Sequence, residues 1–164
     1  MRARSAVLQP VARQTDGEAT RIDWSRVAYG VLRSRALDDL EEKQLLPQRQ
    51  VLYQFCARGH ELIQSLLAEH LTGAHDGVGA YYRGRPLLLS LGLTLQEALA
   101  STMMRAGSLS NGRDVGVIYN LPRTHNVTAL PGAGGVGTQY TPSVGWAQAL
   151  VYRARTLKES GVDF

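Results

Sequence analysis

Cysteine is nearly absent from this 164-residue chain, and no segment stays apolar for long. The single Cys56 has no second cysteine for an internal disulfide, so the sequence favours a reducing compartment such as the cytoplasm, with the thiol buried. No apolar run approaches the roughly 20 residues of a membrane span, so we expect no membrane partner. Residues 1–22 also lack the apolar region of a secretory signal and predict a flexible leader.

Clustered charge is missing as well. The chain carries a formal net charge of +4, but its arginines are scattered along the sequence and are not clustered on one helix or strand that could contact a nucleic acid. We therefore expect a solvated basic surface and no nucleic-acid partner. The apolar fraction of 44% and the charged fraction of 20% are typical of one globular domain.

Several catalytic motifs are incomplete. His60 and Glu61 begin an HExxH zinc motif, but Gln64 stands where the second histidine belongs. Gly137 occupies the position of a P-loop lysine, and no serine lies in a GxSxG turn. The sequence thus gives no support to a zinc protease, a P-loop nucleotidase or a serine hydrolase.

The first half of the chain predicts a helix, a strand and a second helix. Asp23 is an N-cap candidate for a helix ending near Leu46, before Pro47. Its predicted buried face is Ala28, Leu32, Ala36 and Leu40. Residues 51–55 predict a short strand, and an apolar-periodic helix follows Gly59.

The second half predicts further α/β alternation. After a glycine-rich turn over 73–79, Thr94 and Glu97 form a capping box at the start of a helix. The irregular stretch 107–123 is expected to line a site. A strand over 127–130, a turn over 131–137 and a helix with Pro142 in its first turn, ending near Gly161, follow. That helix is expected to bury Val144, Ala147, Leu150 and Val151. Residues 162–164 look like the entry to another strand, so we expect a partial domain over 23–164, truncated at its C-terminus.

The glycine turn has two interpretations, a dinucleotide-binding site and a structural turn. Gly132, Gly134 and Gly137 have GxGxxG spacing between a predicted strand and a predicted helix, as in a dinucleotide fingerprint. The acidic residue expected about 20 positions later to bind a ribose is missing from 153–157. A non-catalytic tight turn is the structural alternative.

Residues 27–164 resemble the front portion of the alpha subunit of the thiamine-diphosphate-dependent decarboxylating component of 2-oxo acid dehydrogenase complexes. The landmarks are RSRALDDL, RGHEL, YYRGRPLLLSLG, NGRDVGVIYN and GVGTQYTPSVGWAQAL, in family order. The resemblance implies an α/β thiamine-diphosphate-binding fold, of which this chain supplies the N-terminal part, with helices around an incomplete parallel sheet.

The resemblance also implies roles for individual residues. Tyr82 and Arg83 would hold the cofactor diphosphate, and an arginine fork suits phosphate oxygens. Gly134 and Val136 would lie against the aminopyrimidine ring, with Val136 supporting its bent conformation. Phe55 would lie at the substrate pocket and favour an apolar acyl chain.

Three further positions bear on ions and protons. By the same resemblance, Thr138 and Gln139 belong to a turn that binds a structural monovalent cation. Ile118 stands where many family members have a histidine. The magnesium motif is expected beyond Phe164, so this polypeptide alone is expected to be inactive.

The implied reaction is oxidative decarboxylation of pyruvate or a branched-chain 2-oxo acid, as in branched-chain amino acid catabolism, with acyl transfer to lipoamide. Thiamine diphosphate would be the electron sink. The implied partners are a beta subunit, which provides the activating glutamate, and a lipoyl-bearing acyltransferase. The other hypothesis is a non-catalytic or dinucleotide-binding α/β module that uses the turn over 132–137.

Overall fold

The computed structural model describes residues 21–114, 118–121 and 127–162. They form a mixed helical structure with a small parallel sheet, consistent with the expected α/β class. The expected leader over 1–22 lies almost wholly outside the described residues, as do the last two positions of the expected strand over 162–164. The elements in chain order are α1 (Trp24–Leu40), the π-helix η1 (Glu41–Leu45), α2 (Glu61–His70), β1 (Gly77–Val78), α3 (Arg85–Ser90), α4 (Leu95–Thr102), β2 (Thr128–Ala129) and α5 (Tyr140–Arg155).

Helix α1 begins where its cap predicts. The Asp23 side chain accepts hydrogen bonds from the backbone N–H groups of Ser25 (2.9 Å) and Arg26 (3.2 Å), which satisfies donors that have no intrahelical partner. The helix continues into η1 and stops at Leu45, close to the predicted end. Its start and its length are therefore confirmed.

The predicted buried face of α1 is wrong. Ala28 and Ala36 are exposed, and Leu32 is 65% exposed. The residues buried instead are Val27, Gly30, Ser34, Leu37 and Asp38. Apolar spacing misleads here because a carboxylate on the inner face has a buried arginine partner from another helix.

The predicted strand over 51–55 is also wrong. Val51 is buried, but Leu52 and Tyr53 are exposed, and the segment pairs with neither strand of the described sheet. A strand needs a neighbouring ladder for its backbone groups. This segment is instead an irregular connection between η1 and α2.

The sheet consists of β1 and β2 in parallel, with Gly77 opposite Thr128 and Val78 opposite Ala129. The ladder is extended by hydrogen bonds from Thr128 N to Asp76 O (2.9 Å) and from Leu130 N to Val78 O (2.8 Å). The strand expected over 127–130 is thereby confirmed, whereas β1 lies within a segment expected to be only a turn.

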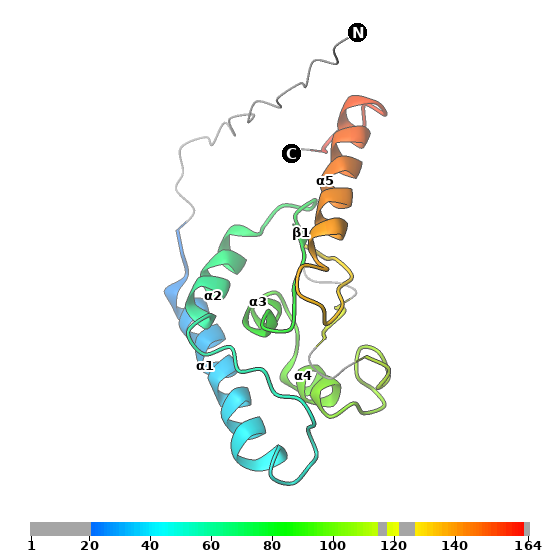
Figure 1. Cartoon of the computed structure of the whole chain (residues 1–164). Coiled ribbons are helices and arrows are strands. Elements are labelled where there is room, and N and C mark those ends of the chain that lie inside the picture. The colour runs from blue at the N-terminus through cyan, green and yellow to red at the C-terminus, as the bar shows by residue number, and fades with distance from the viewer. Residues whose placement is uncertain (1–20, 115–117, 122–126, 163–164) are drawn as a thin grey trace, which may run out of the picture.

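Helices α1, α2 and α3 pack on one another, and α5 extends away from this group (Figure 1). The predicted capping box of α4 is present: the Thr94 side chain accepts from the Glu97 N–H, and the Glu97 carboxylate accepts from the Thr94 N–H. An apolar cluster joins α1, α3, α4 and the 118–121 segment. Its buried members are Leu37, Leu88, Leu89, Leu93, Ala98, Tyr119 and Leu121.

Helix α5 is confirmed, although it ends at Arg155, before the predicted Gly161. Of its expected inward residues only Leu150 is buried, and Val144 is 57% exposed. Trp146 holds the helix to the sheet region, since its Nε1 donates to the His75 carbonyl (2.9 Å). None of the helices in the described ranges is long and apolar enough to cross a membrane.

Candidate functional site

Three of the predicted site residues gather in one cluster. The rings of Phe55 and Tyr82 lie 4.8 Å apart, centroid to centroid. The guanidinium carbon of Arg83 lies 5.7 Å from the Phe55 ring centroid and 5.5 Å from that of Tyr82. A cation at this distance is attracted to the ring faces. The predicted substrate residue Phe55 is thus a neighbour of the predicted diphosphate residues Tyr82 and Arg83, although Tyr82 follows Phe55 by 27 positions.

Arg83 is held at both its side chain and its backbone. Its Nη1 donates to the Cys56 carbonyl (2.6 Å), and its own carbonyl accepts from the Gln64 side-chain amide (3.0 Å). The Gln64 amide oxygen in turn accepts from the Leu87 N–H (3.2 Å). Gln64, which spoils the HExxH pattern, therefore connects α2 to the Tyr82–Arg83 turn and the start of α3.

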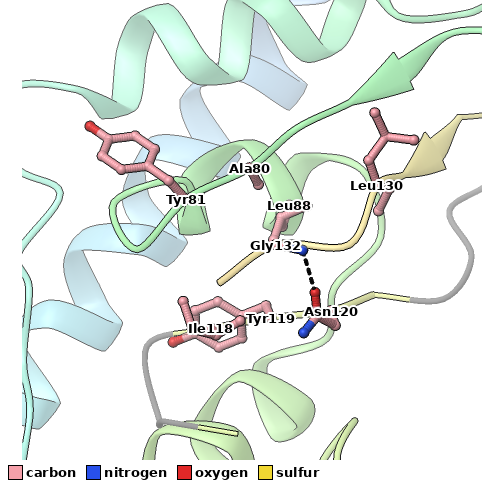
Figure 2. A pocket seen from close by; sticks show the side chains of 9 residues that line it. Ala80, Tyr81, Leu88, Ile118, Tyr119, Asn120, Leu130 and Gly132 are labelled. Carbon is pink, nitrogen blue, oxygen red and sulfur yellow. Dashed lines mark hydrogen bonds between the residues drawn. The ribbon is translucent and has the colours of Figure 1, made fainter. Parts of the chain in front are cut away.

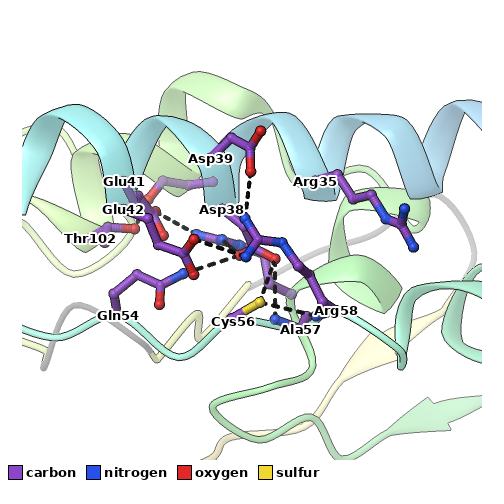
Figure 3. A network of polar contacts seen from close by, with 12 residues as sticks. Arg35, Asp38, Asp39, Glu41, Glu42, Gln54, Cys56, Ala57, Arg58 and Thr102 are labelled. Atoms are coloured by element: carbon purple, nitrogen blue, oxygen red, sulfur yellow. Dashed lines mark hydrogen bonds and ion pairs between the residues drawn. The ribbon is translucent and has the colours of Figure 1, made fainter.

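A buried ionic network, part of which Figure 3 shows, is linked to this cluster through Cys56 and Ala57. Arg85 pairs with Asp38 and with Glu41, and all three side chains are almost fully buried. The Asp38 Oδ2 also accepts from the Ala57 N–H (3.2 Å) and lies 3.5 Å from the Cys56 sulfur. The buried Asp38 carboxylate of α1 thus contacts both the start of α3, through Arg85, and the 56–57 segment, whose Cys56 carbonyl accepts from Arg83.

The formal charges of this network sum to −1, since two carboxylates face one guanidinium. Burial by itself would lower the pKa of Arg85, but nearby negative groups, Glu41 and Asp38 among them, raise it above its usual value. Arg85 therefore stays charged at any ordinary pH. The Tyr119 hydroxyl lies 3.4 Å from Arg85 Nη1 and 3.1 Å from the Thr102 hydroxyl, and burial raises the pKa of Tyr119.

A second, solvated set of charges lies beside the first. Arg58 pairs with Asp39 and Glu42, and Lys43 pairs with Asp39 at 2.7 Å. The hydrogen bond from Lys43, with those from Arg58, lowers the pKa of Asp39. For Cys56 the main effect is burial, which raises the pKa of the thiol. A neutral thiol beside Asp38 is not an activated nucleophile.

The glycine turn meets the segment before Tyr82 at a small pocket (Figure 2). The pocket has a volume of about 10 Å³, room for about one water, and its wall includes Tyr81, Tyr119 and Gly132. Gly132 N–H donates to the Asn120 side-chain oxygen (2.8 Å), so the 118–121 segment fixes the start of the turn. The two motifs that the sequence singled out therefore lie on two sides of one pocket.

Gly134 and Val136 lie in the exposed part of this turn. A Cβ at Gly134 would meet only Ile118 Cδ1, at 3.9 Å, which is an ordinary contact. Val136 is 81% exposed, so its side chain has little packing role within the described residues. Ile118, which the resemblance aligns with a histidine in many family members, is buried and would contact a Cβ at Gly134.

Thr138 and Gln139, the predicted cation-binding residues, follow at the end of the same turn. The Thr138 hydroxyl lies 2.8 Å from the Gly135 carbonyl and 3.1 Å from the Ala133 carbonyl. The Gln139 side-chain oxygen is buried and has no hydrogen-bond partner among the described residues. Neutral oxygens of this kind are the donors that hard cations prefer.

Sequence reasoning did not identify Asp38, Glu41, Arg85 or Asn120. The available signal was the acidic run DDLEE on a helix whose apolar residues form no convincing inner face. In the described part of the chain, no three His, Cys, Asp or Glu side chains are grouped as metal ligands.

Comparisons with family models, with curated proteins and with solved structures gave no match to this chain. The functional argument therefore depends on the sequence landmarks and on the geometry of the site.

Proposed function

We propose that this chain is part of the alpha subunit of a 2-oxo acid dehydrogenase and contributes the diphosphate side of a thiamine-diphosphate site. The observation that carries the proposal is the convergence of the 80–83 segment with the glycine turn. The Ala80 carbonyl lies 3.1 Å from where a Cβ of Gly132 would be, and Tyr81 and Gly132 line one pocket. The proposal needs such proximity, because it assigns the Tyr82–Arg83 segment to the diphosphate and the glycine turn to the aminopyrimidine ring of the same cofactor.

The residues present fit the chemistry of the cofactor. Apart from Nη1, the guanidinium nitrogens of Arg83 make no hydrogen bond within the described ranges, so donors remain for phosphate oxygens. The Tyr82 hydroxyl adds a further donor. The exposed Val136 and the uncrowded Gly134 leave room for a flat ring. At about 10 Å³ the pocket itself cannot enclose the cofactor, which would lie along its outer edge.

Each residue then has a defined task in the proposed site. Arg83 neutralises and orients the diphosphate, and the Cys56 carbonyl fixes the direction of its side chain. Phe55 presents an apolar surface beside the anion site, which suits an aliphatic acyl chain more than a polar one. When bound, thiamine diphosphate supplies the electron sink for decarboxylation. The proposed fold is the thiamine-diphosphate-binding fold.

The proposed oxygen set at Thr138 and Gln139 has a supporting role. A monovalent cation there would be bound by neutral oxygens and would stiffen the turn that carries Gly134 and Val136. Magnesium, the beta subunit and the lipoyl-bearing acyltransferase complete the proposed assembly, which we place in the cytoplasm.

The test is a calorimetric titration of the full chain with thiamine diphosphate and Mg²⁺, repeated with Arg83→Gln. Loss of the Arg83 fork should weaken binding by roughly 10- to 100-fold, the range for a lost hydrogen bond to a charged group. Arg105→Gln is the matched control, since Arg105 is exposed and the change in net charge is the same. Equal affinity of wild type and Arg83→Gln would overturn the proposed function.

A dinucleotide-binding module is the second candidate. It is favoured by the order β2, glycine turn, α5 and by the positive φ of Gly137 (87°), which agree with a GxGxxG turn. However, the acidic residue expected about 20 positions later to bind the ribose is missing from 153–157. Titration with NAD decides the point: measurable heat with NAD and none with thiamine diphosphate would favour this candidate.

A further inference from the structure

A second polar pocket lies away from the proposed cofactor site, where α1, α2 and α3 meet. It has a volume of about 180 Å³. Its wall is formed by Arg26, Tyr29, Arg33, Glu69, Leu89, Ser90 and Gly92. Neither Tyr82 nor Arg83 belongs to this wall, so the two sites are separate.

The Arg33 side chain is fixed in place before any ligand arrives. Its Nη2 donates to the Leu89 carbonyl (2.8 Å), and its guanidinium carbon lies 4.6 Å from the centroid of the Tyr29 ring. Its Nε is buried and has no hydrogen-bond partner in the part of the chain that the structure describes. An arginine with one contact to a carbonyl, one to a ring face and none to a carboxylate keeps an uncompensated charge.

Arg26 provides a second cation on the same wall. It precedes Arg33 by seven positions, about two turns of α1, so the two side chains share one helix face. Among the described residues its one ion pair is with Glu69, at an Nε–Oε1 distance of 3.5 Å, and its side chain is 65% exposed. Two guanidinium groups and one carboxylate leave the pocket with a formal charge of +1.

The lining argues for a small, strongly charged ligand. The arginine and tyrosine side chains of the wall supply donors, which suits a group with many acceptor oxygens. The exposed guanidinium of Arg26 gives an anion an open approach. An apolar ligand would leave these donors without partners.

We propose that this pocket binds a phosphate group, either as the free ion or on a small phosphomonoester, through Arg26 and Arg33. Arg33 is the preset anchor and Arg26 closes on the anion from the solvent side, exchanging its long contact with Glu69 for phosphate oxygens. The Tyr29 hydroxyl group completes the donor set.

The test is NMR spectroscopy of the ¹⁵N-labelled full chain at constant ionic strength. Inorganic phosphate should produce a saturable shift of the Arg33 Nε–H signal. Arg33→Gln should remove saturable binding, and Arg26→Gln should weaken it by about tenfold, as expected for loss of one charge-assisted hydrogen bond. Arg105→Gln has the same change in net charge at an exposed position outside the pocket, and it should bind as wild type does.

Glycerol 3-phosphate forms the second arm of the experiment. Tighter binding than that of phosphate identifies an ester as the ligand, and weaker binding identifies the free ion. Arg26→Gln keeps the test decisive if Arg33→Gln is unstable, because Arg26 is mostly exposed. Non-saturable shifts with both ligands, or equal weakening by Arg105→Gln, would overturn the proposal. Because Arg83→Gln should leave this binding intact, failure here is distinguishable from failure of the proposed cofactor site.

Discussion

Asp38 and Arg83 bind the two sides of one peptide group. Asp38 Oδ2 accepts from the Ala57 N–H at 3.2 Å, and Arg83 Nη1 donates to the Cys56 carbonyl at 2.6 Å. The carbonyl and the N–H belong to the same peptide bond, so a buried carboxylate on α1 fixes the group that orients the proposed diphosphate residue. The ionic network is therefore part of the site's construction as well as of the core.

Replacing Arg85 by methionine should strongly destabilise the fold. The variant would leave Asp38 and Glu41 buried side by side without their cation. Removing one partner of a buried ion pair costs about 3–5 kcal/mol. Urea denaturation should show this loss in the free energy of unfolding. Arg58→Met, which removes the exposed pairs with Asp39 and Glu42, should cost far less, and similar losses for the two variants would contradict the assigned burial.

Substitution of Gly134 by alanine separates folding from cofactor binding. The new methyl group would meet Ile118 Cδ1 at 3.9 Å, so the midpoint of thermal unfolding should change little. If the aminopyrimidine ring lies against this glycine, as proposed, thiamine-diphosphate affinity should drop by at least about tenfold. Calorimetric titration of the folded variant with thiamine diphosphate measures this affinity. Unchanged affinity would remove Gly134 from the proposed site.

Gly77→Ala should disturb the contact between β1 and α5. A Cβ at Gly77 would lie 2.5 Å from Trp146 Cδ1 and 2.6 Å from its Nε1, so the indole must move and its bond to the His75 carbonyl must lengthen. Overpacking of this kind costs about 1–3 kcal/mol. Tryptophan fluorescence during denaturation should report both effects.

The matched control for that variant is Gly145→Ala, one residue before the same tryptophan. A Cβ at Gly145 would have no neighbour within 4 Å, and the residue lies inside α5. Alanine there should stabilise the protein by about 0.5–1 kcal/mol through helix propensity. A stabilising Gly77→Ala would show that the indole does not lie where the structure has it.

Stability should decrease in acid partly through Glu61. Burial disfavours its charged form, but hydrogen bonds from backbone N–H groups and from Arg35 (3.0 Å) bring its pKa below the usual 4.5. A carboxylate with a lowered pKa stabilises the folded state above pH 4.5, and this contribution is lost as the pH falls through the folded-state pKa. The stability difference between wild type and Glu61→Gln should therefore shrink below pH 4.5. A pH-independent difference would contradict this assignment.

Local sequence signals predicted the starts of α1 and α4 well and the buried faces of α1 and α5 poorly. The Asp23 cap and the Thr94–Glu97 capping box depend on neighbours within three residues, so the sequence contains all the atoms involved. The buried face of α1 depends on Arg85, 47 positions after Asp38, which no periodicity in the helix can indicate. Hydrophobic spacing therefore selected exposed leucine and alanine residues in place of the buried carboxylates.

The candidate site shows the same division. Glycine spacing and the Tyr82–Arg83 pair were visible in the sequence, and the family resemblance, more than their chemistry alone, implied their role at an anion. The approach of Phe55 to Tyr82, and the capture of Gly132 by Asn120, arise from tertiary packing between distant segments. The failed strand over 51–55 has the same origin, because the segment that carries Phe55 is shaped by its contacts to α1.

The parallel pairing of β1 with β2 also has a kinetic consequence. Gly77 and Thr128 are about fifty residues apart, and the chain between them contains α3 and α4. Closing so long a loop has an entropic cost that four ladder residues cannot offset by themselves. We therefore expect the helices to dock first and bring the strand ends together, so that the sheet forms late in folding. On this expectation the glycine turn and the start of α5, which follow β2 directly, would reach their places only after the helical core exists.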